Sequence, residues 1–139
     1  MTKYMLRKFY KNWKKAFLSY RLLYRKNRLT FPEPLQKDIV IKYFDASLIK
    51  SNSGSYDFIN NIELKSSTAL HGCTPFNSNQ NNCSRIIYME IDILIDMILI
   101  YELSQSDVQM INSSISNGVY NLSLSHYKKN ATNTVTIKL

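Results

Sequence analysis

The sequence has few of the residues on which small catalytic or metal-binding domains depend. It contains two cysteines, Cys73 and Cys83, two histidines, His71 and His126, and three glycines. Nine residues separate the cysteines, which fits no CxxC or zinc-ligand spacing, and a Gly-rich phosphate loop is absent. Neither histidine is part of a nucleophile-base pattern. We therefore expect no enzyme activity, metal or cofactor, while a disulfide between the cysteines stays possible.

Acidic residues are missing from one part of the chain. Residues 1–32 hold ten Lys or Arg and no Asp or Glu, whereas residues 33–139 hold eight Lys or Arg and ten acids. The first segment therefore has a formal charge of +10 and the remainder −2, which together give the net charge of +8. Such asymmetry indicates a cationic segment that meets a polyanion, either nucleic acid or an anionic membrane surface.

Helix breakers are also absent from this cationic segment, since Pro32 is the first proline and no glycine precedes it. Apolar residues recur at every third or fourth position from Leu6 onward, which predicts an amphipathic helix over residues 3–28 and then an extended linker up to Pro34. The RNA-binding residues expected in this helix are Lys3, Arg7, Lys8, Lys11, Lys14, Lys15, Arg21, Arg25, Lys26 and Arg28.

Three interpretations of the cationic helix are open. Its cations can neutralise nucleic-acid phosphates while aromatic residues pack on bases, sugars or neighbouring protein. Basic residues with aromatic bulk suit an interfacial membrane helix equally well, and an Arg-rich, acid-poor segment is also typical of an organellar transit peptide. Nucleic acid is the leading interpretation. The aromatic residues expected to pack on it are Tyr4, Tyr10, Trp13 and Tyr24.

The chain after the linker has the patterns of a small α+β domain over residues 35–124. Apolar residues alternate in residues 38–44, which predicts a strand, whereas residues 56–65 have helical spacing. Residues 66–84 are rich in Asn and Ser and predict a loop.

Residues 86–103 form an apolar run that acidic residues interrupt. Each acid costs roughly 2.5 to 3.5 kcal/mol near a bilayer centre, so a membrane span is excluded. Apolar residues fill every odd position from 87 to 103 while the acids lie at even positions, which predicts two strands joined by a tight reversal within residues 92–96. The acids would then lie on a solvated or partner-facing surface. They are Glu90, Asp92, Asp96 and Glu102.

The remaining residues complete a β-α-β-β-α-β order. A helix is expected from Ser106 to residue 116, a strand over residues 119–124, and a tail over residues 125–139 that orders only against a partner. This order predicts a ferredoxin-like fold with a four-stranded antiparallel sheet, preceded by the basic helical extension of residues 1–34. The aromatic signature of an RRM is absent from the expected strands.

Two short motifs resemble the small-subunit ribosomal protein ten family, also known in bacteria as NusE. Residues 42–49, KYFDASLI, match its Lys-x-Phe-Asp-x-x-Leu-Ile pattern at the end of a strand, and residues 118–124, GVYNLSL, match its closing Gly-Val step and Leu-Ser-Leu strand. The resemblance covers about residues 38–124. It implies the same ferredoxin-like fold and a position in the head of the small ribosomal subunit.

The sequence and this resemblance together predict a structural constituent of a mitochondrial small ribosomal subunit. Such a protein would reside in the matrix, bind rRNA and neighbouring small-subunit proteins, and take no small-molecule substrate. Lys42 of the first motif and Arg85 join the expected RNA-binding residues, while the acids of residues 86–103 would face basic neighbours. The alternative is a small accessory subunit of a mitochondrial membrane complex, with its cationic helix lying on anionic lipid.

Overall fold

Helix α1 (Lys3–Leu23) confirms the predicted amphipathic helix and ends before residue 28. The computed structural model describes all residues except 26–28, 53, 69–72, 77 and 116–119. Thr2 caps the helix, since its Oγ1 accepts a hydrogen bond from the Met5 N–H at 3.1 Å. Steps of three and four residues place an apolar stripe on one side of the helix, and this stripe is buried. Its members are Leu6, Tyr10, Trp13 and Phe17.

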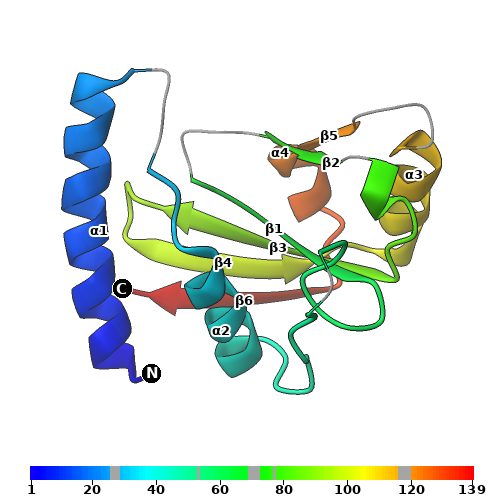
Figure 1. The fold of residues 1–139 in the computed structure, drawn as a ribbon, viewed down its shortest axis with the longest axis horizontal. Helices are drawn as coiled ribbons and strands as arrows, with labels where there is room; N and C mark the ends of the chain where they lie inside the picture. The colour runs from blue at the N-terminus through cyan, green and yellow to red at the C-terminus, as the bar shows by residue number, and fades with distance from the viewer. Residues whose placement is uncertain (26–28, 53, 69–72, 77, 116–119) are drawn as a thin grey trace.

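A four-stranded mixed sheet forms the centre of the fold (Figure 1). Its order is β1 (Ile62–Thr68), β3 (Arg85–Asp92), β4 (Met97–Glu102) and β6 (Asn133–Lys138). Strand β1 is parallel to β3, whereas the β3–β4 and β4–β6 pairs are antiparallel. The predicted α+β class and N-terminal helix are thus confirmed, but the prediction of an antiparallel sheet is wrong for β1, and the elements do not follow the β-α-β-β-α-β order.

The two strands predicted within residues 86–103 are confirmed as the β3–β4 hairpin. Two-residue alternation places Ile87 and Met89 on one face of β3 and Ile86 and Tyr88 on the other, and all four are buried. The reversal falls between Asp92 and Met97, as expected.

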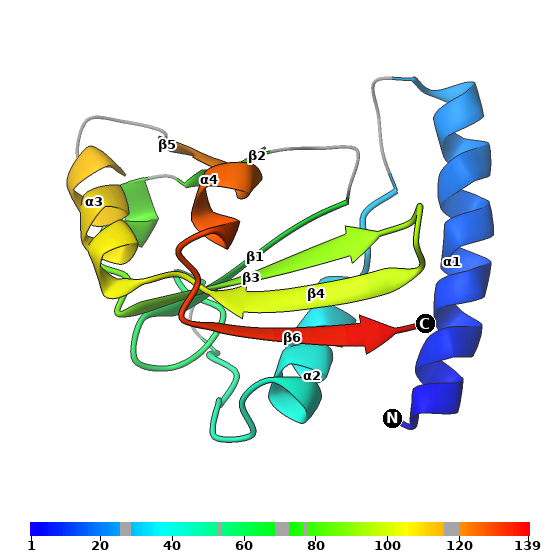
Figure 2. The same cartoon turned by 180° about the vertical axis from the view of Figure 1, so that it is seen from behind.

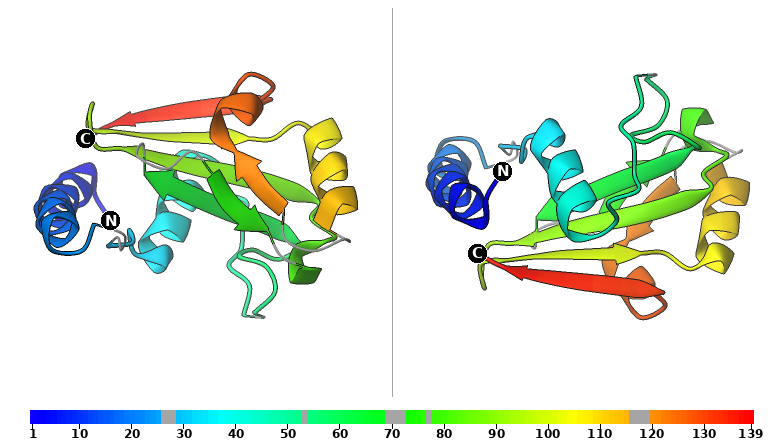
Figure 3. Two further views of the ribbon diagram at one scale, coloured as in Figure 1. Left: turned by 90° about the horizontal axis from the view of Figure 1, so that it is seen from above. Right: turned by 90° about the horizontal axis from the view of Figure 1, so that it is seen from below.

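Helices cover both faces of the sheet, so the molecule has two apolar clusters. Helices α1 and α2 (Glu33–Tyr43) pack with one cluster, which contains Ile87, Ile98 and Ile100. Helix α3 (Gln105–Ile115) contributes to the other, with Tyr88 and Tyr101. Figures 2 and 3 show α1 standing at the end of the sheet where the β3–β4 turn and the C-terminus lie.

The prediction of a strand over residues 38–44 is wrong, because these residues belong to helix α2. Pro34 lies in the first turn, where a missing N–H is harmless, and Gln36, Ile39 and Val40 form its buried face. Spacings of three and four residues link these positions, so the same apolar residues that alternate like a strand also fit a helix. Residues 42–49 therefore end a helix and begin a turn.

The predictions for residues 56–84 are also wrong in part. The expected helix is replaced by strand β1, and positive φ angles of 64° at Asn60 and 59° at Asn61 reverse the chain before it. Within the expected loop, β2 (Cys73–Phe76) pairs with β5 (Tyr120–Ser123) in a separate two-stranded sheet, and a 3₁₀ turn spans Ser78–Gln80. The predicted final strand thus exists in β5, but it lies outside the main sheet.

The C-terminal tail is ordered within the chain itself, so the prediction that it requires a partner is wrong. Helix α4 (Leu124–Lys128) is followed by β6, which adds to the edge of the sheet beside β4. Ile137 is buried there opposite Ile98. The predicted helix before β5 is confirmed in α3, where the Asp107 N–H donates to Ser104 Oγ rather than to a Ser106 cap.

Candidate nucleic-acid interface

Cationic side chains follow one line along α1. An α-helix turns about 100° per residue, so steps of three and four residues bring side chains to the same side. Leu18 occupies the single gap in this line, and the helical part from Lys3 to Arg21 spans about 27 Å at 1.5 Å per residue. We call this line the cation row, and its members are Lys3, Arg7, Lys11, Lys14, Arg21 and, just beyond the helix, Arg25.

Most of the charge on α1 is exposed and has no carboxylate beside it. Within the part of the chain that the structure describes, the only α1 cation with an acidic partner is Lys14, whose Nζ lies 2.7 Å from Asp96 Oδ1. Lys8 and Lys15 extend the charged surface on the outer side of the helix, and both are exposed. The surface therefore keeps a strong positive field.

Asp96 fixes α1 against the end of the sheet. It lies in the β3–β4 turn with a positive φ of 53°, and its Oδ1 accepts hydrogen bonds from Tyr10 Oη and Lys14 Nζ, both at 2.7 Å. The bond from Lys14 lowers the pKa of Asp96, while burial raises the pKa of Tyr10. At the other side of the helix, Trp13 Nε1 donates to the Thr30 carbonyl at 3.2 Å. The cation row is thus held in one position.

Two shallow concavities follow the cation row and share Leu18. One has a volume of about 320 Å³ and lies between α1, Asp96 and the C-terminal Leu139, while the other, of about 540 Å³, lies beside Leu22. Five cations and one acid line the two concavities. The cations are Lys11, Lys14, Lys15, Arg21 and Arg25.

Two of the predicted RNA-binding residues lie away from α1, and two others, Lys26 and Arg28, lie outside the described residues. Lys42 is on α2, where its Nζ donates to the Met1 carbonyl and lies 5.6 Å from the centre of the Tyr43 ring. It therefore lies near the start of α1 but not on the same line. Arg85, at the start of β3, is instead engaged within the fold.

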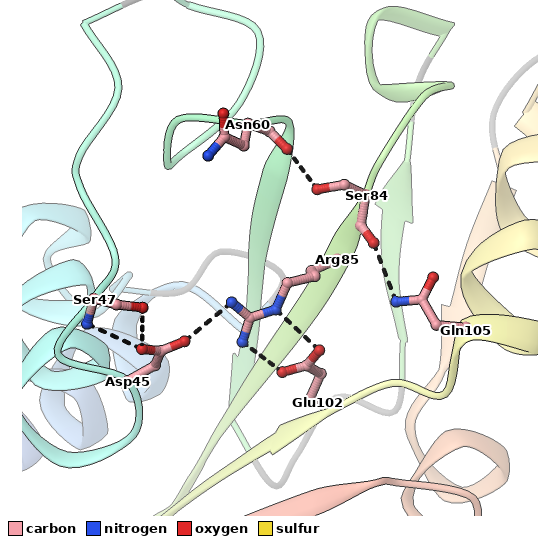
Figure 4. Close-up of polar contacts among 7 residues, drawn as sticks. All are labelled: Asp45, Ser47, Asn60, Ser84, Arg85, Glu102 and Gln105. Atoms are coloured by element: carbon pink, nitrogen blue, oxygen red, sulfur yellow. Dashed lines mark hydrogen bonds and ion pairs between the residues drawn. The ribbon is translucent and has the colours of Figure 1, made fainter.

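Arg85 joins three separate segments through two ion pairs (Figure 4). Its guanidinium lies 3.0 Å from Asp45 and 2.7 Å from Glu102, which it contacts through two nitrogens. The bond to Glu102 raises the pKa of Arg85 further, and Asp45 also accepts hydrogen bonds from the Ser47 N–H and hydroxyl. Arg85 thereby ties the turn after α2 to β3 and β4.

We expect Arg85→Met to destabilise the fold by roughly 2 kcal/mol without changing RNA affinity. The substitution leaves the carboxylates of Asp45 and Glu102 without their cation, although water reaches each group and offsets part of the loss. Urea unfolding and an RNA titration measure the two effects. Lys8→Met is the matched control, because Lys8 is exposed and should show the opposite pattern; a loss of RNA affinity in Arg85→Met alone would contradict the assignment.

Two of the four aromatic residues predicted to pack on nucleic acid cannot do so. Tyr10 and Trp13 are only 2% and 5% exposed, because they belong to the buried stripe of α1. Tyr4 is 73% exposed near the start of the helix, and Tyr24 stands at its end with its ring centre 5.0 Å from that of Tyr20. The middle of α1 therefore offers charge rather than stacking surfaces.

The acids of the hairpin do not form the solvated face predicted for them. Glu90 is buried and pairs with Lys128 of α4, Asp96 holds α1, and Asp92 accepts a hydrogen bond from the Leu94 N–H at 3.0 Å. The prediction assumes that even-numbered positions share one face along both strands. The reversal instead places Glu90 opposite Leu99, so even positions of β3 share a face with odd positions of β4. The change of face arises because the turn between Asp92 and Met97 has an even number of residues, which the sequence pattern does not reveal.

The described residues contain no group of three or more His, Cys, Asp or Glu side chains arranged to hold a metal ion. In the same part of the chain, no helix is both long and apolar enough to cross a bilayer. Cys83 is buried, and burial raises the pKa of its thiol to about 12. Comparison of the chain with protein-family models, curated proteins and solved structures gives no match.

Proposed function

We propose that this protein binds RNA through the cation row, as a structural constituent of a ribonucleoprotein particle. The supporting observation is a fixed line of cations along α1 in which, among the described residues, only Lys14 is paired with an acid. The sequence resemblance suggests the mitochondrial small ribosomal subunit as the particle and its proteins as neighbours. In the ribosomal protein family the motif of residues 42–49 ends a strand, whereas here it ends helix α2. The proposal therefore depends more on the charge asymmetry of the chain than on this motif.

Binding would proceed by phosphate neutralisation. Each cation that contacts a phosphate releases a condensed counterion, so affinity falls steeply as salt rises. The buried stripe and Asp96 hold α1 in place before RNA arrives, so little conformational freedom is lost on binding. Contacts of this kind position the protein on RNA without reading its sequence.

We expect the triple variant Arg7→Ala, Lys11→Ala, Arg21→Ala to bind RNA about a hundredfold more weakly near 150 mM salt, because each lost phosphate contact removes roughly fivefold. The slope of log affinity against log salt should decrease in magnitude by about 2 to 3. Fluorescence anisotropy of labelled rRNA fragments across a salt series gives both quantities.

The matched control removes three cations elsewhere and leaves α1 intact. Lys50, Lys129 and Lys138 are exposed, so their replacement by Ala changes the net charge equally. We expect a loss of only a fewfold, from the smaller general field. Equal losses in the two triple variants, or salt-independent binding by the unaltered protein, would rule out the cation row as the RNA site.

A second candidate function follows from apolar residues that border the same surface. Leu22 is 84% exposed on α1, and Leu94 and Ile95 are 75% and 56% exposed in the β3–β4 turn. Exposed aliphatic residues beside cations also suit an anionic membrane surface, as an accessory subunit of a mitochondrial membrane complex would require. Flotation with cardiolipin-containing vesicles, run against co-sedimentation with ribosomal subunits, separates the two functions.

A further inference from the structure

We infer that the RNA bound by the cation row is double-helical and is recognised by its phosphate backbone rather than its bases. This inference rests on the proposed function and specifies its ligand. It depends on which side chains the fold leaves available along α1, which the sequence alone does not reveal.

Base stacking is the first property that the fold removes from the row. Proteins that hold single strands stack successive bases on aromatic side chains, in addition to contacting phosphates. In α1 the central aromatic residues face inward: Trp13 has its ring centre 5.0 Å from those of both Phe17 and Phe31, and all three are buried. The exposed rings Tyr4, Phe9 and Tyr24 lie apart along α1, so they form no continuous stacking platform beside the row.

Side chains that combine a donor and an acceptor, which many base-edge contacts need, are the second feature that the row lacks; its cations can donate only to acceptors such as phosphate oxygens and guanine O6 or N7. Its members are Lys and Arg with Leu18 between them, and α1 contains no Asp or Glu. Asn12, the amide residue of α1, projects from the opposite flank of the helix, about 140° from the centre of the row at 100° per residue. Cations and aliphatic side chains make up most of the lining of the concavities beside the row. Asp96 and Tyr10 also line one of them, where Asp96 Oδ1 already accepts hydrogen bonds from Tyr10 and Lys14.

Charge density and rigidity then favour a duplex. A double helix carries about twice as many phosphates per unit length as one strand, so a line of cations meets more negative charge. A duplex also presents these phosphates in rigid rows, whereas a flexible single strand must be ordered against α1. Recognition of double-stranded RNA by shape and phosphates is a known mode of binding that requires neither stacking nor base-edge contacts.

The test compares two RNA probes on the full chain. One is a hairpin with a stem of about 16 base pairs, the length that one double-stranded-RNA domain spans, and the other is a U tract with the same number of nucleotides. We expect the hairpin to bind at least about tenfold more tightly at equal salt, and Tyr4→Ala to change either affinity less than about twofold. Stacking on one base would instead be worth roughly 5-fold to 150-fold.

The outcomes distinguish this inference from the function on which it rests. If the U tract binds as tightly as the hairpin, or if Tyr4→Ala weakens U-tract binding more than about fivefold, the duplex inference fails while RNA binding stands. If neither probe shows salt-dependent binding that the triple variant of Arg7, Lys11 and Arg21 reduces, the proposed function fails and the inference with it. A tighter hairpin complex that is insensitive to Tyr4→Ala supports both.

Discussion

Replacing Trp13 by Ala is expected to lower the free energy of unfolding by about 3 to 5 kcal/mol. The indole is 5% exposed and packs against Phe17 and Phe31, and its Nε1 donates to the Thr30 carbonyl. The substitution therefore creates a cavity between α1 and the rest of the fold and leaves a carbonyl without its donor. Because small domains are stable by only about 5 to 15 kcal/mol, the midpoint of urea unfolding should fall markedly.

Leu22→Ala is the matched control on the same helix. Leu22 is 84% exposed, so its loss should change stability by no more than about 0.5 kcal/mol. A Trp13→Ala variant as stable as Leu22→Ala would mean that α1 is an appendage and not part of the cooperative fold. The RNA affinity of Trp13→Ala should also fall, because the row would lose its rigid support.

The sequence alone suggests that α1 is a basic extension outside the domain, whereas the expected loss of stability treats it as part of the fold. The helix could be predicted, because apolar residues at steps of three and four need only local information. Its packing surface could not, since a stripe such as Tyr10 and Trp13 does not say what covers it. Tyr10 bonds to Asp96 across 86 positions of the chain, a distance at which periodicity carries no signal.

The two misassigned elements have different causes, and the first is a short apolar run. Residues 38–44 fit both a two-residue and a three-to-four-residue period, and such runs are too brief for periodicity alone to decide. Pro32 and Pro34 were the deciding local signal, since proline at the start of a helix is favourable. Strand β1 was not predicted for a different reason: its apolar-polar alternation covers only residues 62–65, and the rest of the strand, Ser66, Ser67 and Thr68, is polar.

The β3–β4 hairpin could be predicted because its apolar alternation is long rather than short. Its alternation extends over eighteen residues, from 86 to 103, long enough to exclude a helix and to require a reversal. The roles of its acids nevertheless depend on partners far along the chain, such as Lys128 for Glu90. For the candidate site, the cations of α1 could be predicted from the sequence. That the buried stripe fixes six of them in one row, and that Arg85 pairs with Asp45 and Glu102 within the fold, could be seen only in the structure.

A buried acid in β1 should make stability fall as pH rises toward 8. Glu63 is 3% exposed; its Oε1 accepts a hydrogen bond from Gln80 Nε2 at 2.7 Å and lies 3.3 Å from Lys65 Nζ. Burial raises the pKa of Glu63 to about 8, the negative charge of Asp57 adds to the shift, and Lys65 offsets only part of it.

The sign of the effect follows from proton binding. Between the pKa of about 4.5 in the unfolded chain and about 8 in the folded protein, Glu63 holds its proton only in the folded state. Stability from this group is therefore fully present below about pH 4.5 and is lost progressively up to about pH 8. At roughly 1.4 kcal/mol for each unit of pKa difference, the loss is on the order of several kcal/mol.

Glu63→Gln should remove this dependence, because the amide has a similar shape and cannot ionise. We expect the variant to exceed the unaltered protein in stability at pH 8 and above, and to approach it near pH 5, in urea unfolding measured across that range. Glu33→Gln is the control, since Glu33 lines the same 430 Å³ concavity but its side chain is 68% exposed. The three proteins differ only at Glu63 and Glu33, so the difference between their curves isolates the contribution of Glu63. Parallel curves for the unaltered protein and Glu63→Gln would show that the Glu63 carboxyl is already ionised in the fold at neutral pH, with Lys65 rather than a proton balancing its charge.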